Sequence, residues 1–349
     1  MDFSTFQEAW LASLRDLWKR GRRVPGVVDP QSVGSSFGAG ARDFVEVVGA
    51  RLRVENPRAR LIHATSYRPD LAFSIAQTLW TFSGSADTGF IEFYNPRGRD
   101  FSSQGRLLSA PGPRIFGTGV GAQFSAAVKL LARDKSSRRA MIQIFLPEDM
   151  VYGYRDASCI GSVQLLLRDD RLHSIVTMRS QSAARVLPYD SFLLSMIHEA
   201  AALELGITMG DYILFCGSLH YYAEEADLVE ALIGTTDRPP APMPPMESKL
   251  SSIGSELGRA EVEIRGRLAR NIRAAIEFGR FNLDPYWTDV LKVLVIGIRM
   301  RRGAHEDTEL AELPAVYRSI IAARRDQAGS LGEGIQGSVP RNSQRSRRE

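Results

Sequence analysis

The sequence has few cysteines, few histidines and no long apolar run, and each shortage narrows the possible classes of protein. Only two cysteines, Cys159 and Cys216, occur in 349 residues, which argues against a disulfide framework and predicts a reducing, cytoplasmic location. No apolar segment is long enough to span a bilayer and the start shows no signal-peptide pattern, so no membrane partner is expected. The five histidines lack the spacing of metal ligands, and no metal site is predicted.

What is present is the composition of an ordinary globular protein. Hydrophobic residues make up 44% of the chain and charged residues 24%, and a chain of this length forms one large domain or two ordinary ones. Arginines are concentrated in a Gly-, Ser- and Gln-rich stretch at the C-terminus, which predicts a disordered basic tail over 327–349. Because the rest of the chain is nearly neutral, nucleic acid is not expected as a partner.

Hydrophobic periodicity predicts an α/β protein. Helical spacing occurs over residues 6–22, 72–82, 123–133, 191–205, 251–278, 287–301 and 313–325. Strand-like runs occur over 43–54, 140–145, 163–167 and 174–179, and the last two are expected to form a hairpin around Asp169-Asp170. The proline cluster from Pro239 to Pro245 predicts a linker between a domain over 1–245 and a helical extension over 246–326.

Cys159 is a candidate nucleophile because of the residues that accompany it. It opens one strand-like run, and Arg179-Ser180 closes the next. On neighbouring strands of a hairpin, the guanidinium group would lie close to the thiol, lower its pKa and favour the thiolate. A lone cysteine in a strand is more often a small buried hydrophobe, and this reading applies to Cys216. The order of the surrounding motifs decides between the two readings for Cys159.

Six segments, in their order along the chain, resemble motifs of the thymidylate synthase family. They are the helix 74–84 with Trp80, the arginine pair at the end of 134–139, the strand 159–164, Arg179-Ser180, Leu187-Pro188-Tyr189-Asp190 and the segment 217–222. The resemblance covers about residues 5–245 and implies a thymidylate-synthase-like sheet with packed helices, followed by a helical C-terminal extension.

The resemblance implies a folate-dependent one-carbon transferase that acts on a pyrimidine nucleoside monophosphate. Cys159 would add to C6 of the ring, so that C5 attacks the methylene carbon of 5,10-methylenetetrahydrofolate. The implied substrate contacts are Arg138, Arg139, Arg179 and Ser180 for the phosphate, Asp190 for the base, His220 and Tyr222 for the sugar, and Gln164; Trp80 and Ser182 are the implied folate contacts. In the family the arginine pair reaches the partner subunit's phosphate site, so a homodimer with a shared active site is implied.

Asp190 is the most informative departure, because thymidylate synthases carry asparagine at this place. An asparagine amide accepts from N3–H of uracil and donates to O4, whereas a carboxyl group donates only when protonated. A carboxyl group can instead accept from the N4 amino group of cytosine and share a proton with N3. The branch of the family with aspartate here comprises the CMP and dCMP hydroxymethylases. The alternative is that Asp190 caps the helix predicted over 191–205, and both roles are compatible.

Other departures concern the catalytic groups. Gln77 stands where the family has its catalytic glutamate, and the loss of such a proton relay typically costs about 10²–10⁴ in rate. Glu92 and Asp100 are the candidate replacements. Ser182 stands where the family has a folate-contacting aspartate, and the arginine of its N-terminal phosphate loop is not visible near Ser32–Ser36. These changes fit either a hydroxymethylase or a protein that has lost catalysis.

The resemblance therefore implies 5-hydroxymethylation of CMP or dCMP with 5,10-methylenetetrahydrofolate and water. Two alternatives stay open: a C5 methyltransferase that acts on UMP or dUMP, and a catalytically degenerate nucleotide-binding homologue. Nothing in the sequence distinguishes ribose from deoxyribose. A nucleoside-antibiotic pathway and a phage base-modification system are hypotheses that rest on family analogy alone.

Overall fold

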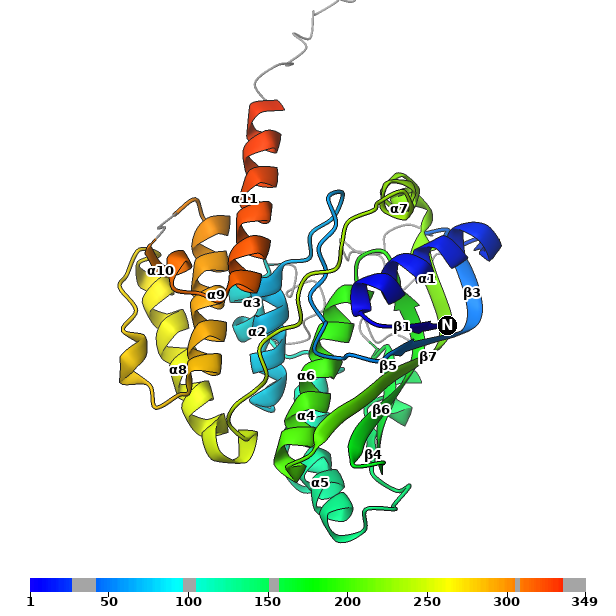
Figure 1. The fold of residues 1–349 in the computed structure, drawn as a ribbon, viewed down its shortest axis with the longest axis horizontal. Helices are drawn as coiled ribbons and strands as arrows, with labels where there is room; N and C mark the ends of the chain where they lie inside the picture. Colours follow the sequence, from blue (N-terminus) through cyan, green and yellow to red (C-terminus); the bar gives the residue numbers. More distant parts are fainter. Residues whose placement is uncertain (27–41, 97–104, 151–156, 305–307, 335–349) are drawn as a thin grey trace, which may run out of the picture.

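A seven-stranded sheet lies at the centre of the fold, with the strand order β1-β3-β7-β6-β5-β4 and with β2 paired to β3 (Figure 1). The computed structural model describes residues 1–26, 42–96, 105–150, 157–304 and 308–334. The strands are β1 (Asp2–Phe3), β2 (Arg22–Val24), β3 (Phe44–Val54), β4 (Met141–Gln143), β5 (Ile160–Arg168), β6 (Arg171–Ser182) and β7 (Thr208–Tyr222). A sheet packed with helices confirms the α/β fold class expected from the sequence.

β5 and β6 form the hairpin that the sequence predicts around Asp169-Asp170. Both turn residues have left-handed backbone angles, with φ of 50° and 55°, which match the twist of a two-residue hairpin turn. β6 and β7 are parallel, so the chain crosses over between them, and α6 (Leu187–Leu205) lies in this crossover. The start of β5 and the ends of β6 and β7 consequently meet at one end of the sheet.

Helices cover one face of this sheet (Figure 1). α1 (Phe6–Arg20) packs on β3, α5 (Gln123–Arg133) on β4 and β5, and α6 on β6 and β7. Because side chains alternate across a strand, neighbours on β7 differ: Leu214 and Cys216 are buried, whereas Phe215 between them is 45% exposed. The opposite face also carries a row of Met141, Gln164, Ile175 and Ile213 in register across four strands. This face is called the open face below.

The C-terminal helices share a core with α2 (Leu71–Phe82). They are α8 (Leu250–Arg270), α9 (Pro285–Arg301), α10 (Thr308–Ala311) and α11 (Ala315–Gly334). α9 approaches α2 so closely that a Cβ atom at Gly297 would lie 2.4 Å from the Cβ of Ala72. Trp287 on α9 is fully buried, with its ring centroid 6.3 Å from that of Phe82. The C-terminal helices therefore complete the packing around α2, the helix that carries Gln77 and Trp80.

A buried ion pair beneath α6 also binds the segment that leads into α8. Arg60, 1% exposed, donates to the Glu199 carboxylate on α6, and Glu199 also accepts from the Met246 backbone N–H at 3.0 Å. The proline-containing segment before α8 is attached in the same way, because Met243 is buried and its N–H donates to the Arg58 carbonyl at 3.0 Å. Removing one partner of such an ion pair would leave an uncompensated buried charge.

We expect Trp287→Ala to lower the free energy of unfolding by about 3 to 5 kcal/mol, because it removes a fully buried indole and leaves a cavity between α9 and α2. Chemical denaturation followed by circular dichroism measures the change. Trp18 on α1 is 43% exposed, so Trp18→Ala is a matched control with an expected effect below about 0.5 kcal/mol. Equal effects of the two substitutions would contradict a shared core.

The start of one helix differs from the sequence prediction. α6 begins at Leu187 rather than at residue 191, because Pro188 suits the first turn of a helix, where its missing N–H has no helical partner. At the other end of the chain, α11 runs to Gly334, past residue 327, where the sequence predicts the basic tail to begin. Residues 335–349 lie outside the described residues, and the domain boundaries at 245 and 326 stay predictions.

Candidate functional site

Cys159 lies immediately before β5 and faces Arg179 on β6. The Arg179 backbone N–H donates to the Cys159 carbonyl at 3.0 Å, and the Nη2 atom of Arg179 lies 3.8 Å from the Cys159 Sγ. Cys159 is half-buried. The predicted hairpin thus brings a cation beside the thiol, where positive charge favours the thiolate. The role of Cys159 as a nucleophile stays a prediction.

Two backbone carbonyls hold the Arg179 side chain in place. Its Nε donates to the Ser158 carbonyl at 2.8 Å, and its Nη2 donates to the Ala157 carbonyl at 3.0 Å. Within the described part of the chain, no carboxylate pairs with this guanidinium group. Because carbonyls orient a guanidinium group without neutralising it, its charge is available to an anion. Ser180 follows on the same strand, paired with Ser218 of β7, so further hydroxyl donors lie on adjacent strands.

His220 and Tyr222 lie at the end of β7, and Arg42 joins them there. The Arg42 guanidinium lies 3.5 Å from the centroid of the Tyr222 ring, and its Nε donates to Glu224 at 2.6 Å. Burial lowers the pKa of His220, and the Arg42 and Arg179 guanidinium groups lower it further. Two cations therefore act on a neutral imidazole. Arg42 was not predicted from the sequence, because its contact with Tyr222 arises only when β3 pairs with β7.

Asp190 lies in the first turn of α6 and is 8% exposed. The N-cap residue is Val186, which makes no side-chain cap bond, so the capping role considered for Asp190 is wrong because the helix starts earlier than predicted. Burial raises the pKa of Asp190 to about 6, and the neighbouring Gln181 amide acts in the opposite direction. A carboxyl group with this pKa changes between acceptor and donor close to neutral pH.

Arg138 and Arg139 precede β4, toward the end of β5 that is remote from Cys159. The Gln164 amide on β5 donates to the Arg138 carbonyl at 2.9 Å. With about 3.3 Å per strand residue, this places the arginine pair roughly 15 to 20 Å along β5 from the thiol. Both arginines are exposed, and neither forms an ion pair within the described part of the chain. A single chain therefore does not gather Arg138, Arg139 and Gln164 beside its own Cys159.

The residues predicted to contact folate or to relay a proton are largely enclosed where the structure describes them. Gln77 is half-buried on α2, and its Oε1 is buried without a hydrogen-bond partner. Trp80 is 3% exposed and its indole N–H donates to a backbone carbonyl at 3.0 Å, while Ser182 is 9% exposed. Glu92 is half-buried on α3 (Thr88–Tyr94), and Asp100 lies outside the described residues. Trp80 and Ser182 offer a folate no open surface here, and the roles of all five residues stay predictions.

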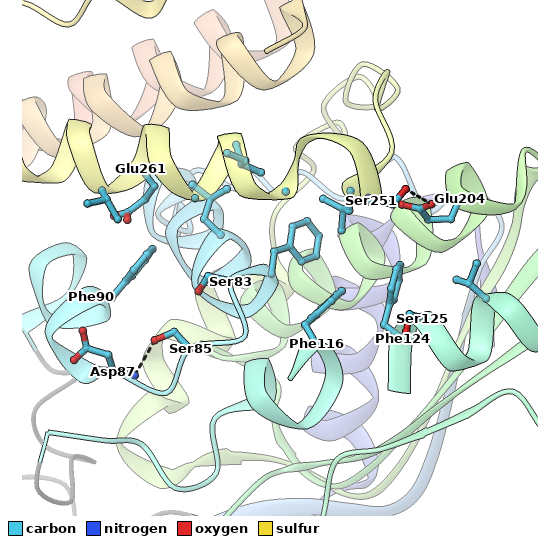
Figure 2. Close-up of a pocket in the computed structure, with 18 of the residues that line it drawn as sticks. Ser83, Ser85, Asp87, Phe90, Phe116, Phe124, Ser125, Glu204, Ser251 and Glu261 are labelled. Carbon is cyan, nitrogen blue, oxygen red and sulfur yellow. Dashed lines mark hydrogen bonds between the residues drawn. The ribbon is translucent and has the colours of Figure 1, made fainter. Parts of the chain in front are cut away.

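A separate cavity of about 690 Å³ lies between α8 and the helices α2, α4 (Pro111–Phe116) and α5. Phe90, Phe116 and Phe124 line it, and Ser251 bonds to the Glu204 carboxylate at one end (Figure 2). No predicted site residue lines this cavity, so it is distinct from the candidate site. Across the described ranges, no group of three or more His, Cys, Asp or Glu side chains is placed to hold a metal ion, and no described helix is long and apolar enough to cross a membrane.

The sequence of this chain matches a known protein family. The sequence model of thymidylate synthase matches residues 80–263, which is more than half of the chain and includes Cys159, Arg179, Asp190 and His220. The chain belongs to the thymidylate synthase family. The resemblance inferred from the order of six motifs is thereby confirmed. The match begins after Gln77, the position of the missing glutamate.

Individual relatives are more distant. A deoxyuridylate hydroxymethyltransferase of Delftia phage PhiW-14 is 27% identical over 201 residues, which cover 52% of this chain and 54% of the relative. One of Bacillus phage SP01 is 26% identical over 198 residues, covering 52% and 51%. A thymidylate synthase of Bacillus licheniformis is 28% identical over 97 residues, covering 28% and 34%. The chain spans about half the length, or less, of these curated relatives.

Proposed function

We propose that the protein is a folate-dependent one-carbon transferase that hydroxymethylates C5 of a pyrimidine nucleoside monophosphate, CMP or dCMP. The observation that carries the proposal is the Arg179 guanidinium group held by two carbonyls at 3.8 Å from the Cys159 sulfur. The Arg179 guanidinium group favours the thiolate form of Cys159, and its positive charge can also bind a phosphate. Family membership and the two relatives named as hydroxymethyltransferases support the reaction class.

In this proposal each residue of the site has a distinct task. The Cys159 thiolate adds to C6 of the ring, which makes C5 a carbon nucleophile. Arg179 and Ser180 bind the phosphate and thereby fix the ring over the sulfur. His220, neutral because burial and two guanidinium groups lower its pKa, and Tyr222 bind the sugar. The family's co-substrate, 5,10-methylenetetrahydrofolate, supplies the one-carbon unit, and water supplies the hydroxyl group of the product.

The choice of cytosine rests on Asp190. Its carboxyl group is enclosed in the first turn of α6 and does not cap the helix, which supports a role in contacting the base. A protonated carboxyl group can form hydrogen bonds with either cytosine or uracil. The basic ring nitrogen N3 of cytosine can share the proton of the Asp190 carboxyl group, whereas O4 of uracil cannot. Loss of that proton therefore weakens the binding of uracil more than the binding of cytosine.

A second candidate is hydroxymethylation of dUMP, favoured by the names of the two phage relatives. It requires Asp190 to stay protonated and to donate to O4. With a pKa of about 6, this form is a minority above pH 6 and becomes rarer as the pH rises. Transfer of a methyl group, as a thymidylate synthase performs, is a third outcome that the product distinguishes.

The test is release of tritium from C5 of CMP, dCMP, UMP and dUMP, each with and without methylenetetrahydrofolate. The proposal predicts folate-dependent release from a cytidine nucleotide, and the sugar that supports release is the natural one. Preferential release from dUMP would favour the second candidate. No release from any of the four nucleotides would contradict an enzyme and leave a nucleotide-binding homologue in which Gln77 has replaced the proton relay.

We also propose a homodimer formed through the open face of the sheet. Arg138 and Arg139 are too far along β5 to reach the Cys159 of their own chain, yet no acidic partner occupies them in the described residues. The open face extends between the arginine pair and Cys159. It presents Phe215 and Met141, whose side chains are 45% and 43% exposed. A second copy on this face would cover the apolar side chains, and it could bring the arginine pair of one chain toward the phosphate bound by the other.

Phe215→Asp is expected to convert this dimer to a monomer, because it places a carboxylate in the centre of an apolar contact without affecting the buried face of β7. Size-exclusion chromatography with light scattering measures the mass of each species. Val262→Asp on α8 is the control, since Val262 is 58% exposed and lies away from the sheet. A wild-type monomer, or dimeric Phe215→Asp protein, would rule out this interface.

A further inference from the structure

Glu46 on β3 lies directly beside His220 on β7. The two residues are register partners on antiparallel strands, so their side chains lie on the same face of the sheet with Cβ atoms about 4.5 to 5.5 Å apart. Other contacts between these strands agree with this orientation. The Phe44 ring centroid lies 5.4 Å from that of His220, and the Arg42 guanidinium lies over the Tyr222 ring. A carboxylate therefore adjoins the two residues that bind the sugar in the proposed function.

The Glu46 carboxylate is free to accept hydrogen bonds from a ligand. Glu46 is half-buried, and within the described part of the chain no hydrogen bond or ion pair engages its carboxylate. Arg22 on β2 is its register partner on the other side, but the two side chains form no ion pair. By contrast, Asp211 near the other end of β7 pairs with Arg53 at 2.8 Å. Because an ionised carboxylate accepts hydrogen bonds and donates none, the group that it binds must be a donor.

The sugar is the part of a nucleoside monophosphate that suits this position. A phosphate would be repelled by the carboxylate, and the cation proposed to bind it, Arg179, lies on β6. β7 separates β6 from β3, which places Glu46 two strand spacings, roughly 10 Å, from that strand. Ribose carries neighbouring hydroxyl groups at C2′ and C3′, whereas deoxyribose carries only the one at C3′. Two carboxylate oxygens match two neighbouring hydroxyl groups, as in dinucleotide-binding folds, where an acidic residue binds the 2′-hydroxyl group of ribose.

We propose that Glu46 is a specificity-determining residue that accepts a hydrogen bond from the 2′-hydroxyl group of the sugar, so that the substrate is the ribonucleotide CMP. The inference rests on the proposed function, in which His220 and Tyr222 bind the sugar, and it narrows the choice between CMP and dCMP. His220 and Tyr222 serve the hydroxyl group at C3′, which both sugars have. When dCMP binds, the Glu46 carboxylate loses water and gains no donor in return, so the deoxyribonucleotide is disfavoured.

Calorimetry without folate on the wild-type full-length chain tests this preference with CMP, dCMP and 2′-deoxy-2′-fluoro-CMP. We expect CMP to bind about ten- to a hundredfold more tightly than dCMP. The fluoro analogue should bind as weakly as dCMP, because fluorine cannot donate a hydrogen bond to a carboxylate. UMP should be preferred over dUMP by a similar factor, since the contact concerns the sugar and not the base.

Glu46→Ala should reduce the preference for CMP over dCMP to within about twofold, because it removes both acceptor oxygens and weakens the binding of CMP alone. Glu46→Gln keeps one acceptor oxygen in a side chain of the same shape and should retain part of the preference. Glu55→Gln is the matched control, since Glu55 is an exposed carboxylate just past the far end of β3. It should leave every dissociation constant unchanged.

Two results would overturn this inference and leave the proposed function standing. One is wild-type protein that binds dCMP as tightly as CMP, or more tightly. The other is a preference for CMP that Glu46→Ala does not alter. Failure of CMP, dCMP, UMP and dUMP alike to bind the wild-type chain would overturn the proposed function, and the inference with it.

Discussion

Replacing Cys159 with alanine is expected to abolish the release of hydrogen from C5 of the nucleotide, with a loss of at least about a thousandfold in rate. The hydrogen at C5 becomes exchangeable only after a nucleophile has added to C6, and Cys159 is the half-buried thiol beside Arg179. Nucleotide binding should change far less, because the phosphate, sugar and base contacts remain. Tritium release and calorimetry on the same preparation separate the two effects.

Cys216→Ala is the matched control for this prediction. Cys216 is 3% exposed, and burial raises the pKa of its thiol to about 12, so it is neutral and inaccessible at working pH. Its replacement should leave the rate within a fewfold of the wild type. Full activity of Cys159→Ala, or equal losses in both variants, would remove Cys159 from the mechanism.

Asp190→Asn is expected to lower the preference for cytosine over uracil about ten- to a hundredfold. A neutral amide can rotate to present its carbonyl to N4–H of cytosine or its NH₂ to O4 of uracil, so the substitution should broaden the choice rather than invert it. The pH dependence of the preference should also disappear, because the titrating carboxyl group is gone. The measurement is the ratio of kcat/KM for the two bases across the pH range.

Asp211 on β7 offers a control carboxylate at a different position, on the opposite face of the sheet and paired with a cation. It pairs with Arg53 at 2.8 Å across the open face, remote from α6. Asp211→Asn should retain both the preference and its pH dependence. If Asp190→Asn keeps the full cytosine preference, the account of base recognition by this residue fails.

The hairpin that joins Cys159 to Arg179 was predictable because its determinants are local. The alternation of side chains along β5 and β6 and the Asp169-Asp170 turn lie within one short stretch of chain. The order of the motifs then identified the family. The C-terminal helices were also predictable as helices, since their apolar spacing is regular. Their packing against α2 was not, because periodicity identifies an apolar face but not the element that covers it.

The parts of the site that escaped prediction depend on contacts between distant segments. Arg42 reaches Tyr222 only through the pairing of β3 with β7. Glu46 reads as an ordinary polar residue of a strand, and its place beside His220 becomes evident only with the same two strands paired. The start of α6 was misplaced because a proline is compatible with both the end of a loop and the first turn of a helix. The capping role considered for Asp190 followed from that error.

The most direct measurement of the central claim is the mass of the product formed from CMP or dCMP with methylenetetrahydrofolate in water enriched in oxygen-18. Hydroxymethylation predicts a nucleotide that has gained one CH₂O unit with the heavy oxygen in it, because solvent water supplies the hydroxyl group. A gain of one CH₂ unit without heavy oxygen would show methyl transfer instead. An unchanged nucleotide would contradict the proposed activity altogether.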